Sequence, residues 1–313
     1  MDAGDLLLPK LPASLSAQHR SELTLQADLI IKAFNQMGCD GVAVGDADLG
    51  LGKDFFLKMA GGANFPFISS NLMDRETGNP IVKPYVITEM NGLRIGIIAL
   101  ISRDAFEDRE GQPLGELDIQ DPYLTAEQMV RQLRDRTDLI VLLSHLGYQG
   151  DQAFAKRVKG IDIIVGGHTA VPLYYPPVVN ETLILQNSAY GRKIGSTDIE
   201  FSKERGSFGN AGIMKSLRET LVSLEKKIRT LEAQKPGKQR DEALESTVRY
   251  KEIVGKKLQT YGQGKPFRNR IISLHEGIPS DPGVLALIDG YKEKLANLSQ
   301  QRKREGCGSE PET

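Results

Sequence analysis

The sequence predicts an α/β fold in which a layered sheet carries antiparallel additions. In the first half of the chain, apolar strand-type runs alternate with helical patterns, which is typical of parallel sheets. Farther along, short hairpins become more frequent. Two apolar runs, 138–147 and 162–168, are typical of buried strands. Each has a histidine at its carboxyl end, His145 in the first and His168 in the second. In open α/β sheets ligands bind at this edge.

Composition places the chain among ordinary globular proteins. Its 313 residues suffice for one large domain with an extension, or for two domains. The net charge of −1 gives no global field that would favour a nucleic acid polymer or an anionic membrane. No run approaches the roughly 20 apolar residues of a membrane span. Cys39 and Cys307 lie far apart, so we expect neither a disulfide framework nor a metal knuckle.

Residues 9–22 contain prolines and serines and are predicted to form a loop. In 23–37 the apolar residues fall near the helical period, and Gly38 terminates that helix. The dipeptide Asn91-Gly92 is a strong signal for a hairpin between two strands. The other elements expected in this half are a strand at 41–45, a helix at 53–60, a strand entering a loop at 65–71, and the hairpin strands at 82–90 and 93–100.

The next part of the chain completes the predicted compact domain. Asp121 and Pro122 are a helix N-cap and a first helical residue. The remaining elements are the two histidine strands with a helix at about 150–158 between them, a hairpin of 178–179 with 182–186, and a last strand at 193–201. We therefore place the first domain at residues 1–203.

A heptad pattern distinguishes the region beyond this domain. Leucines and one isoleucine recur at steps of four and three, at Leu217, Leu221, Leu224, Ile228 and Leu231. Pro236-Gly237 then separates this helix from a second one at 240–261, so residues 213–261 are predicted to form an antiparallel helical hairpin or coiled coil. We interpret the seam as helix packing, and self-association or a protein partner at 213–261 is the alternative. Residues 264–313 are predicted as a linker up to 285, a short helix at 285–301 and a disordered tail.

Four polar residues at strand ends form a candidate metal site: Asp5, Asp46, His145 and His168. Carboxylate and imidazole ligands together suit zinc, manganese or iron, and suit calcium poorly. Converging at one sheet edge, they could hold a divalent ion. Such an ion lowers the pKa of a bound water and polarises a phosphoryl oxygen.

Structural explanations compete with this hypothesis. An aspartate that follows a glycine at a strand end, such as Asp5, is usually a turn residue or a helix cap. We interpret Asp48 as a loop cap rather than a ligand. A single histidine after an apolar strand is more often structural. Two histidines at equivalent strand ends make the functional and the structural explanation about equally strong. His19 and His275 stand in polar, irregular segments and are predicted to be surface residues.

The order and spacing of four motifs resemble the calcineurin-like metallophosphoesterases, and more narrowly the catalytic domain of the 5′-nucleotidase branch. These motifs are Asp-Ala-Gly-Asp at 2–5, Gly-Asp-Ala-Asp-Leu-Gly-Leu-Gly at 45–52, Ser-His-Leu-Gly at 144–147 and Gly-Gly-His-Thr at 166–169. The resemblance covers about residues 1–203. It implies a four-layer αββα sandwich, a dinuclear metal site that hydrolyses phosphate esters of small molecules, and a periplasmic or exported location.

The resemblance assigns roles to four positions of this chain. Asp5 matches the aspartate that bridges both metals, and Asp46 stands where the family has a metal-binding asparagine. His145 and His168 match ligands of the second metal. On this basis the second half-site is chemically complete, and Asp in place of Asn adds negative charge.

Departures from the family pattern fall on the other half of the site. The opening Asp-x-His motif is absent, because the chain begins with what reads as the end of a strand, and we predict an incomplete N-terminus. Ala47 replaces the histidine that helps to stabilise the transition state, and Ala170 replaces the second histidine of Gly-His-x-His. The sequence therefore predicts one divalent ion at most (zinc, manganese or iron), and no catalytic residue is assigned.

Two functional hypotheses follow. In the first, the chain is a phosphoric-ester hydrolase of the 5′-nucleotidase type, weakened by the loss of one metal site. In the second, it is a non-catalytic pseudo-phosphatase that binds partners through its helical hairpin. The nucleotide-binding C-terminal domain of the family is replaced here by helices, so the resemblance does not specify a nucleotide substrate.

Overall fold

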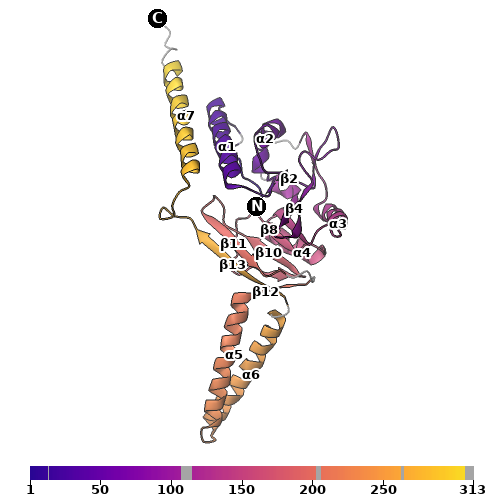
Figure 1. Cartoon of the computed structure of the whole chain (residues 1–313), viewed down its shortest axis with the longest axis vertical. Coiled ribbons are helices and arrows are strands. Elements are labelled where there is room, and N and C mark those ends of the chain that lie inside the picture. Colours follow the sequence, from indigo (N-terminus) through magenta and orange to yellow (C-terminus); the bar gives the residue numbers. More distant parts are fainter. Residues whose placement is uncertain (13, 107–114, 202–205, 262–263, 307–313) are drawn as a thin grey trace.

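The computed structural model describes residues 1–12, 14–106, 115–201, 206–261 and 264–306. Figure 1 shows a body of sheets and helices from which one pair of long helices projects, while the final helix runs beside the first. No helix within these ranges is both long and apolar enough to cross a membrane.

A six-stranded sheet forms the centre of the body, in the order β4-β5-β7-β8-β10-β9. The bounds are β4 Tyr85–Met90, β5 Leu93–Ile101, β7 Leu139–His145, β8 Ile163–Gly166, β9 Val178–Val179 and β10 Thr182–Gln186. The four inner strands are parallel, and β4 and β9 are antiparallel edges. Both faces are covered, which explains why the inner strands are almost continuously apolar.

Alternate residues of β7 enter two different hydrophobic cores. Val141 packs with Ala43 and Ile68, which belong to a second sheet on one side. Ile140 packs with Phe154 of a helix on the other side. This alternation follows the two-residue period of a strand. The covering helices on that outer side are α3 Pro122–Leu133 and α4 Tyr148–Arg157.

The second sheet of the sandwich contains the parallel pair β1 Val42–Ala43 and β2 Phe67–Ile68. Its outer face is covered by α1 Ala17–Met37 and α2 Lys53–Ala60, with Ile31 and Phe56 in the shared core. Helices, two sheets and helices thus form four layers, which confirms the αββα architecture. A separate antiparallel pair joins β3 Leu72–Asp74 to β6 Leu117–Ile119.

Several local predictions agree with the structure. Asn91 and Gly92 both have positive φ, 52° and 76°, as the tight turn between β4 and β5 requires. The Asp121 side chain accepts a hydrogen bond from Leu124 N and caps α3. The loop predicted at 9–22 is wrong over its last residues, because α1 already begins at Ala17 behind the capping side chain of Ser16.

The linker predicted from residue 264 is also wrong over part of its length. Residues Lys265–Ser273 form β13, the central strand of a third sheet with order β11-β13-β12. Its partners are β11 Lys193–Ile199 and β12 Phe208–Asn210. The chain returns here to complete the body, with Phe267 and Phe208 packed into the core between the sheets. Pro266, the second residue of β13, lacks an N–H and is disfavoured in a central strand, but tertiary pairing overrides that local preference.

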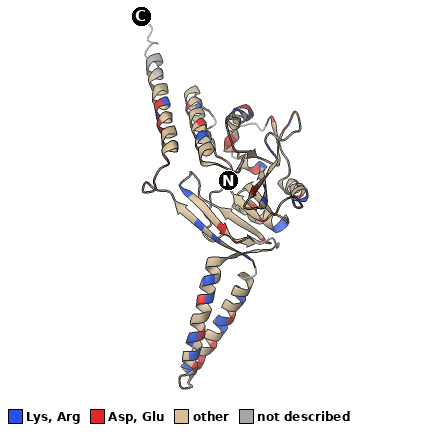
Figure 2. Ribbon diagram, viewed as in Figure 1, with Lys and Arg blue, Asp and Glu red and all other residues tan. Residues whose placement is uncertain are grey.

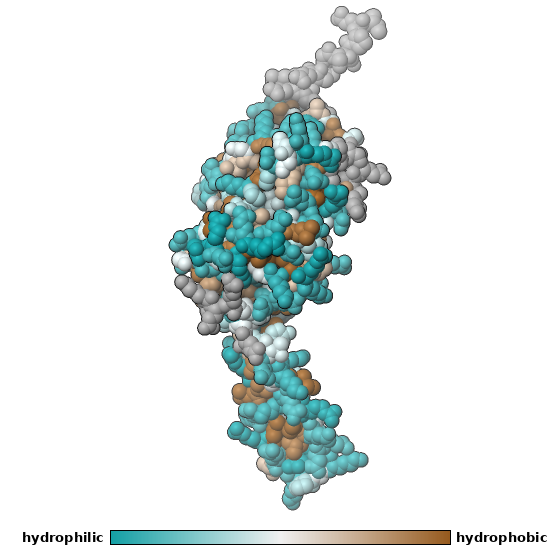
Figure 3. All heavy atoms as spheres, turned by 90° about the vertical axis from the view of Figure 1, so that its right-hand side faces the viewer, coloured by the Kyte–Doolittle hydropathy of each residue, from teal (hydrophilic) through white to brown (hydrophobic). Residues whose placement is uncertain are grey.

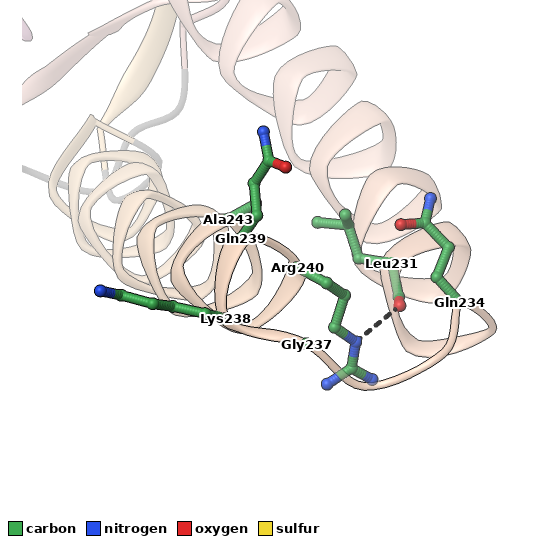
Figure 4. Close-up of a pocket in the computed structure, with 7 residues that line it drawn as sticks. All are labelled: Leu231, Gln234, Gly237, Lys238, Gln239, Arg240 and Ala243. Atoms are coloured by element: carbon green, nitrogen blue, oxygen red, sulfur yellow. Dashed lines mark hydrogen bonds between the residues drawn. The ribbon is translucent and has the colours of Figure 1, made fainter.

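The projecting hairpin consists of α5 Ala211–Glu232 and α6 Lys238–Tyr261. Glu225 and Lys251 form an ion pair across it at 3.1 Å. At its turn, a shallow hollow surrounds Arg240, whose Nε donates to Leu231 O at 2.9 Å (Figure 4). This carbonyl at the end of α5 also accepts Gln234 N at 3.1 Å.

The surface of the hairpin is mixed in character. Basic and acidic residues are interspersed along both helices (Figure 2). Apolar residues interrupt this polar surface (Figure 3), and they include the exposed side chains of Val222 and Ile253.

The final helix, α7 Pro282–Gly306, is longer than the short helix predicted at 285–301. It lies beside α1, where Gln36 Nε2 donates to Asp281 Oδ1 at 2.8 Å. The predicted disordered tail from residue 307 onward lies outside the described residues.

Candidate metal centre

The four predicted ligands meet where the two sheets of the sandwich face each other. Asp46 follows β1, and Asp5 follows the N-terminal segment that bridges β1 through Asp2 and Val42. His145 is the last residue of β7, and His168 lies two residues beyond β8. Each residue offers a ligand atom, and these atoms all lie within 4.8 Å of one another. Among the described residues no other cluster of this kind is found.

Left-handed backbone conformations aim two of these side chains. Asp5 and His168 have φ of 61° and 65°, and Thr169 N donates to Gly167 O at 2.8 Å, closing a tight turn around His168. Such conformations cost a non-glycine residue about 1–3 kcal/mol and concentrate at functional sites. The approach of Asp5 also requires Gly45, because a Cβ there would collide with the Asp5 carboxylate and backbone.

The distances between ligand atoms resemble the edges of a coordination shell. His145 Nε2 lies 2.9 Å from Asp46 Oδ1 and 3.5 Å from Asp5 Oδ2, and His168 Nδ1 lies 3.4 Å from Asp46 Oδ1. Ligands held at about 2.1 Å from one tetrahedral ion are about 3.4 Å apart. The widest separation, up to 4.8 Å, exceeds this edge by as much as about 1.4 Å, so the side chains must move closer together to bind one ion. The side chains of Asp46 and His145 are fully buried, whereas His168 is 23% exposed.

His145 is oriented for metal binding by its other nitrogen. Nδ1 lies 2.8 Å from Ala3 O, so it carries a proton and leaves Nε2 as the ligand atom. Burial opposes a positive charge on this ring, but the hydrogen bonds to Asp46 and Asp5 outweigh burial and raise the pKa of His145 to about 10. A bound cation would replace that second proton among the carboxylates.

The donor set fits a divalent ion. Two carboxylates and two imidazoles are ligands that zinc, manganese and iron accept. Nδ1 of His168 is buried and makes no hydrogen bond with any described residue, and Asp46 Oδ1 of the cluster lies 3.4 Å from it. Buried polar atoms without a hydrogen bond are rare in proteins, and coordination of an ion by this nitrogen would account for it.

Asp48 stabilises the loop that carries the site. Its buried carboxylate accepts hydrogen bonds from three backbone N–H groups, those of Asp5, Leu7 and Gly45, at 2.8–2.9 Å. Burial raises the pKa of Asp48 to about 7, although the bonds from Leu7 and Gly45 oppose this. Asp48 thus ties the N-terminal segment to the loop after β1, in agreement with its interpretation as a cap.

Ala47 and Ala170 stand where the family pattern has histidines, and the structure shows the surroundings of both. Ala47 is buried, and its N–H donates to Asp5 Oδ1 at 2.7 Å, so here it contributes only backbone. Ala170 follows His168 in the same turn and has φ of 53°. Neither side chain can bind a metal or donate a proton. His19 and His275 are exposed, as predicted.

Sequence reasoning missed Gln186, the last residue of β10. Its Nε2 donates to Gly167 O and to Thr169 Oγ1, both at 3.0 Å, and so holds the turn that carries His168. Only its place at the end of a buried strand could have indicated this role.

Asp151 of α4 is a second residue that the sequence did not reveal. It is buried and accepts a short hydrogen bond from the hydroxyl of Ser144, the residue before His145. Burial raises the pKa of Asp151 to about 7, with the Ser144 hydrogen bond opposing that rise.

This raised pKa predicts a pH dependence of stability. A carboxyl whose folded pKa exceeds its unfolded value stabilises the fold at low pH, and that contribution is lost as pH rises from about 4 through about 7. Asp151→Asn stays neutral and should remove this loss. We expect the free energy of unfolding of the variant, measured with urea relative to the wild type, to increase by on the order of 1–3 kcal/mol between pH 5 and pH 8. A constant difference across that range would contradict the assignment.

Comparisons with known proteins agree with the fold. No protein-family model matches the chain. A 5′-nucleotidase of Vibrio cholerae is 28% identical over 247 residues, covering 64% of this chain and 45% of that protein. The chain thus spans less than half the length of this curated relative.

Solved structures share the architecture. A 5′-nucleotidase precursor from Thermus thermophilus superposes with a TM-score of 0.64 at 22% identity, covering 96% of this chain and 50% of the other. The sulfate thiohydrolase SoxB from Thermus thermophilus gives a TM-score of 0.64 at 20% identity, covering 95% and 42%. The fold is that of the 5′-nucleotidase and calcineurin-like phosphoesterase structures, and the chain carries a cluster of two carboxylates and two histidines. Its relatives and structural neighbours support a metallophosphoesterase domain of the 5′-nucleotidase type.

Proposed function

We propose that this protein is a metal-dependent phosphoric-ester hydrolase that works with a single divalent ion. The observation that carries the proposal is the convergence of Asp5, Asp46, His145 and His168 at the junction of the two sheets. The relative from Vibrio cholerae is named a 5′-nucleotidase, which supports a phosphate ester as the substrate class.

The four residues would hold the ion, which when bound supplies a water of lowered pKa and a positive charge for the phosphoryl oxygen. The protein's own groups explain why an ion is needed. Asp5 and Asp46 belong to the cluster, and without a cation their carboxylates would repel a phosphate dianion. The ion should be zinc, manganese or iron, and its identity is part of the proposal.

The missing side chains at Ala47 and Ala170 should reduce the rate. Catalysis by two metals stabilises both the attacking and the leaving oxygen, and one ion stabilises fewer of these charges. Ala47 also offers no imidazole to the developing charge. Loss of such a group typically costs about 100- to 1,000-fold in kcat.

Metal titration tests this function. Protein stripped with a chelator is supplied with zinc, manganese or iron, and release of phosphate from AMP and from para-nitrophenyl phosphate is measured. We expect about one equivalent of metal per chain and a slow activity that requires it. Less than a tenth of an equivalent of every metal, together with no metal-stimulated phosphate release, would refute the proposal.

The second function is a binding module that acts through the projecting hairpin. It is favoured by the apolar side chains exposed on α5 and α6, among them Val222 and Ile253, at positions outside the heptad seam. Self-association or a coiled-coil partner would cover them. A periplasmic or exported location would suit either function and is likewise proposed from the family. Sedimentation of the full chain showing a monomer at all concentrations would argue against self-association.

A further inference from the structure

The carboxyl group of Asp151 lies against the two strands that carry the histidines of the metal centre. Asp151 stands in the first turn of α4, where its N–H donates to Gly147 O at 2.8 Å. Its side chain is fully buried and accepts a short hydrogen bond from the hydroxyl of Ser144 in β7. A Cβ at Gly166 in β8 would collide with Asp151 Oδ2, so glycine at this position leaves the room that the second oxygen occupies.

These two neighbours of the carboxyl group come shortly before the two histidines in the chain. Ser144 and Gly166 are paired residues of β7 and β8. Ser144 directly precedes His145, and Gly166 lies two residues before His168. Side chains of successive strand residues point to opposite faces of a sheet, so Ser144 faces α4 while His145 faces the second sheet and the cluster. Asp151 therefore holds both strand ends from the face opposite to the ligand side chains.

Backbone hydrogen bonds connect the two histidine segments at the same place. Leu146 N donates to Ser144 Oγ at 3.3 Å, so the hydroxyl joins the residues on both sides of His145. Gly167 N donates to Ser144 O at 2.8 Å and ties the turn before His168 to β7. The two imidazole rings lie with their centres 5.0 Å apart. A displacement of the Ser144 side chain would thus be transmitted to both rings.

We propose that Asp151 is a positioning residue of the metal centre, which sets the separation of the imidazoles of His145 and His168 and thereby the affinity for a divalent ion. The inference rests on the proposed function of that centre. The ligand atoms of the cluster are up to 4.8 Å apart, so a shift of one strand end against the other changes how closely they surround one ion. Removal of groups that orient metal ligands typically costs about 10- to 100-fold in metal affinity.

Metal affinity, measured apart from catalysis, tests this role. The full chain is stripped with a chelator and titrated with zinc by calorimetry, and with cobalt, whose absorption spectrum depends on the geometry of its ligands. Asp151→Ala removes the carboxyl group, and Ser144→Ala removes the hydroxyl that donates to it. Asp151→Asn is the conservative variant, because its amide oxygen still accepts from that hydroxyl.

Thr182→Val is the matched control. Thr182 is buried and its hydroxyl donates to Ile161 O at 2.8 Å, at the amino end of the same sheet and away from the cluster. The substitution removes a buried hydrogen bond of similar kind without touching the strand ends that carry the histidines. It should lower the melting temperature and leave zinc affinity and the cobalt spectrum unchanged.

We expect Asp151→Ala and Ser144→Ala to bind zinc about tenfold more weakly or worse and to alter the cobalt spectrum, with Asp151→Asn close to the wild type. Ser144→Ala keeps the experiment informative if Asp151→Ala does not fold. Wild-type affinity in both folded alanine variants would overturn the proposal, and so would an equal loss of affinity in Thr182→Val. An equal loss in Asp151→Ala and Asp151→Asn would assign the effect to charge and would likewise reject a positioning role.

The outcome for Asp151 is separate from that for the hydrolase. A wild type that binds zinc and releases no phosphate refutes the hydrolase, and zinc affinity still tests Asp151. If the wild type binds no zinc, the metal-free chain provides the test. It has four histidines, so NMR of histidine-labelled protein can follow the contact between the rings of His145 and His168. We expect Asp151→Ala to weaken this contact, and an unchanged contact would overturn the proposal.

Discussion

Replacing both histidines, His145→Ala with His168→Ala, should abolish metal binding and the activity that depends on it. Two of the four ligand atoms are lost, and the two remaining carboxylates cannot hold zinc or manganese tightly. An ion present at about 100 times its dissociation constant stabilises a fold by about 2.7 kcal/mol. We therefore expect metal to raise the wild-type melting temperature by about 5–10 °C and to leave the double variant unchanged.

The matched control is His19→Ala with His275→Ala, which removes two exposed histidines and leaves the cluster intact. His145 is buried, so the fold of the test variant must be checked separately by circular dichroism. His168→Ala alone alters a partly exposed side chain and keeps the experiment informative if the double variant unfolds. A metal-dependent shift of wild-type size in a folded double variant would show that the ion binds elsewhere.

Asp48→Ala should be among the most destabilising single substitutions in the body of the protein. It leaves the N–H groups of Asp5, Leu7 and Gly45 without their acceptor in a buried site. Each orphaned donor costs about 1–3 kcal/mol, so we expect a loss of about 3–5 kcal/mol and a melting temperature lower by about 10 °C. Metal affinity should fall too, because Asp5 loses an anchor of its strained backbone.

Asp48→Asn distinguishes hydrogen bonding from charge. Its amide oxygen can still accept from Leu7 or from the Asp5 and Gly45 pair, so an intermediate destabilisation is expected. Glu252→Ala, an exposed acidic residue on α6, should change stability by less than about 0.5 kcal/mol. Equal stability of Asp48→Ala and the wild type, measured by urea unfolding, would refute the capping role.

Local signals in the sequence were enough to locate most of the elements. The predicted helix at 53–60 coincides with α2, and the turn at Asn91-Gly92 joins the two strands expected on either side of it. These features depend on residues a few positions apart, such as an N-cap or a pair of left-handed turn residues. The order of the motifs also indicated the family.

Long-range pairing was not predictable in the same way. Strand β13 contains Pro266 and lies in a segment punctuated by proline and glycine, so it reads as a linker until β11 pairs with it from about 70 positions earlier. The role of Gln186 likewise depends on two loops that only the fold brings together. Sheet pairing is decided by what lies opposite a strand, which no local window contains.

By itself, the sequence determined the layered α/β class, the four residues at strand ends, and the alanines that stand where the family has histidines. Only the tertiary structure decided that Asp5, Asp46, His145 and His168 meet within 4.8 Å. It alone revealed the three hydrogen bonds to Asp48. The physical reason is that a residue's type fixes its chemistry, whereas its distance from distant partners is fixed by the packing of two sheets against each other.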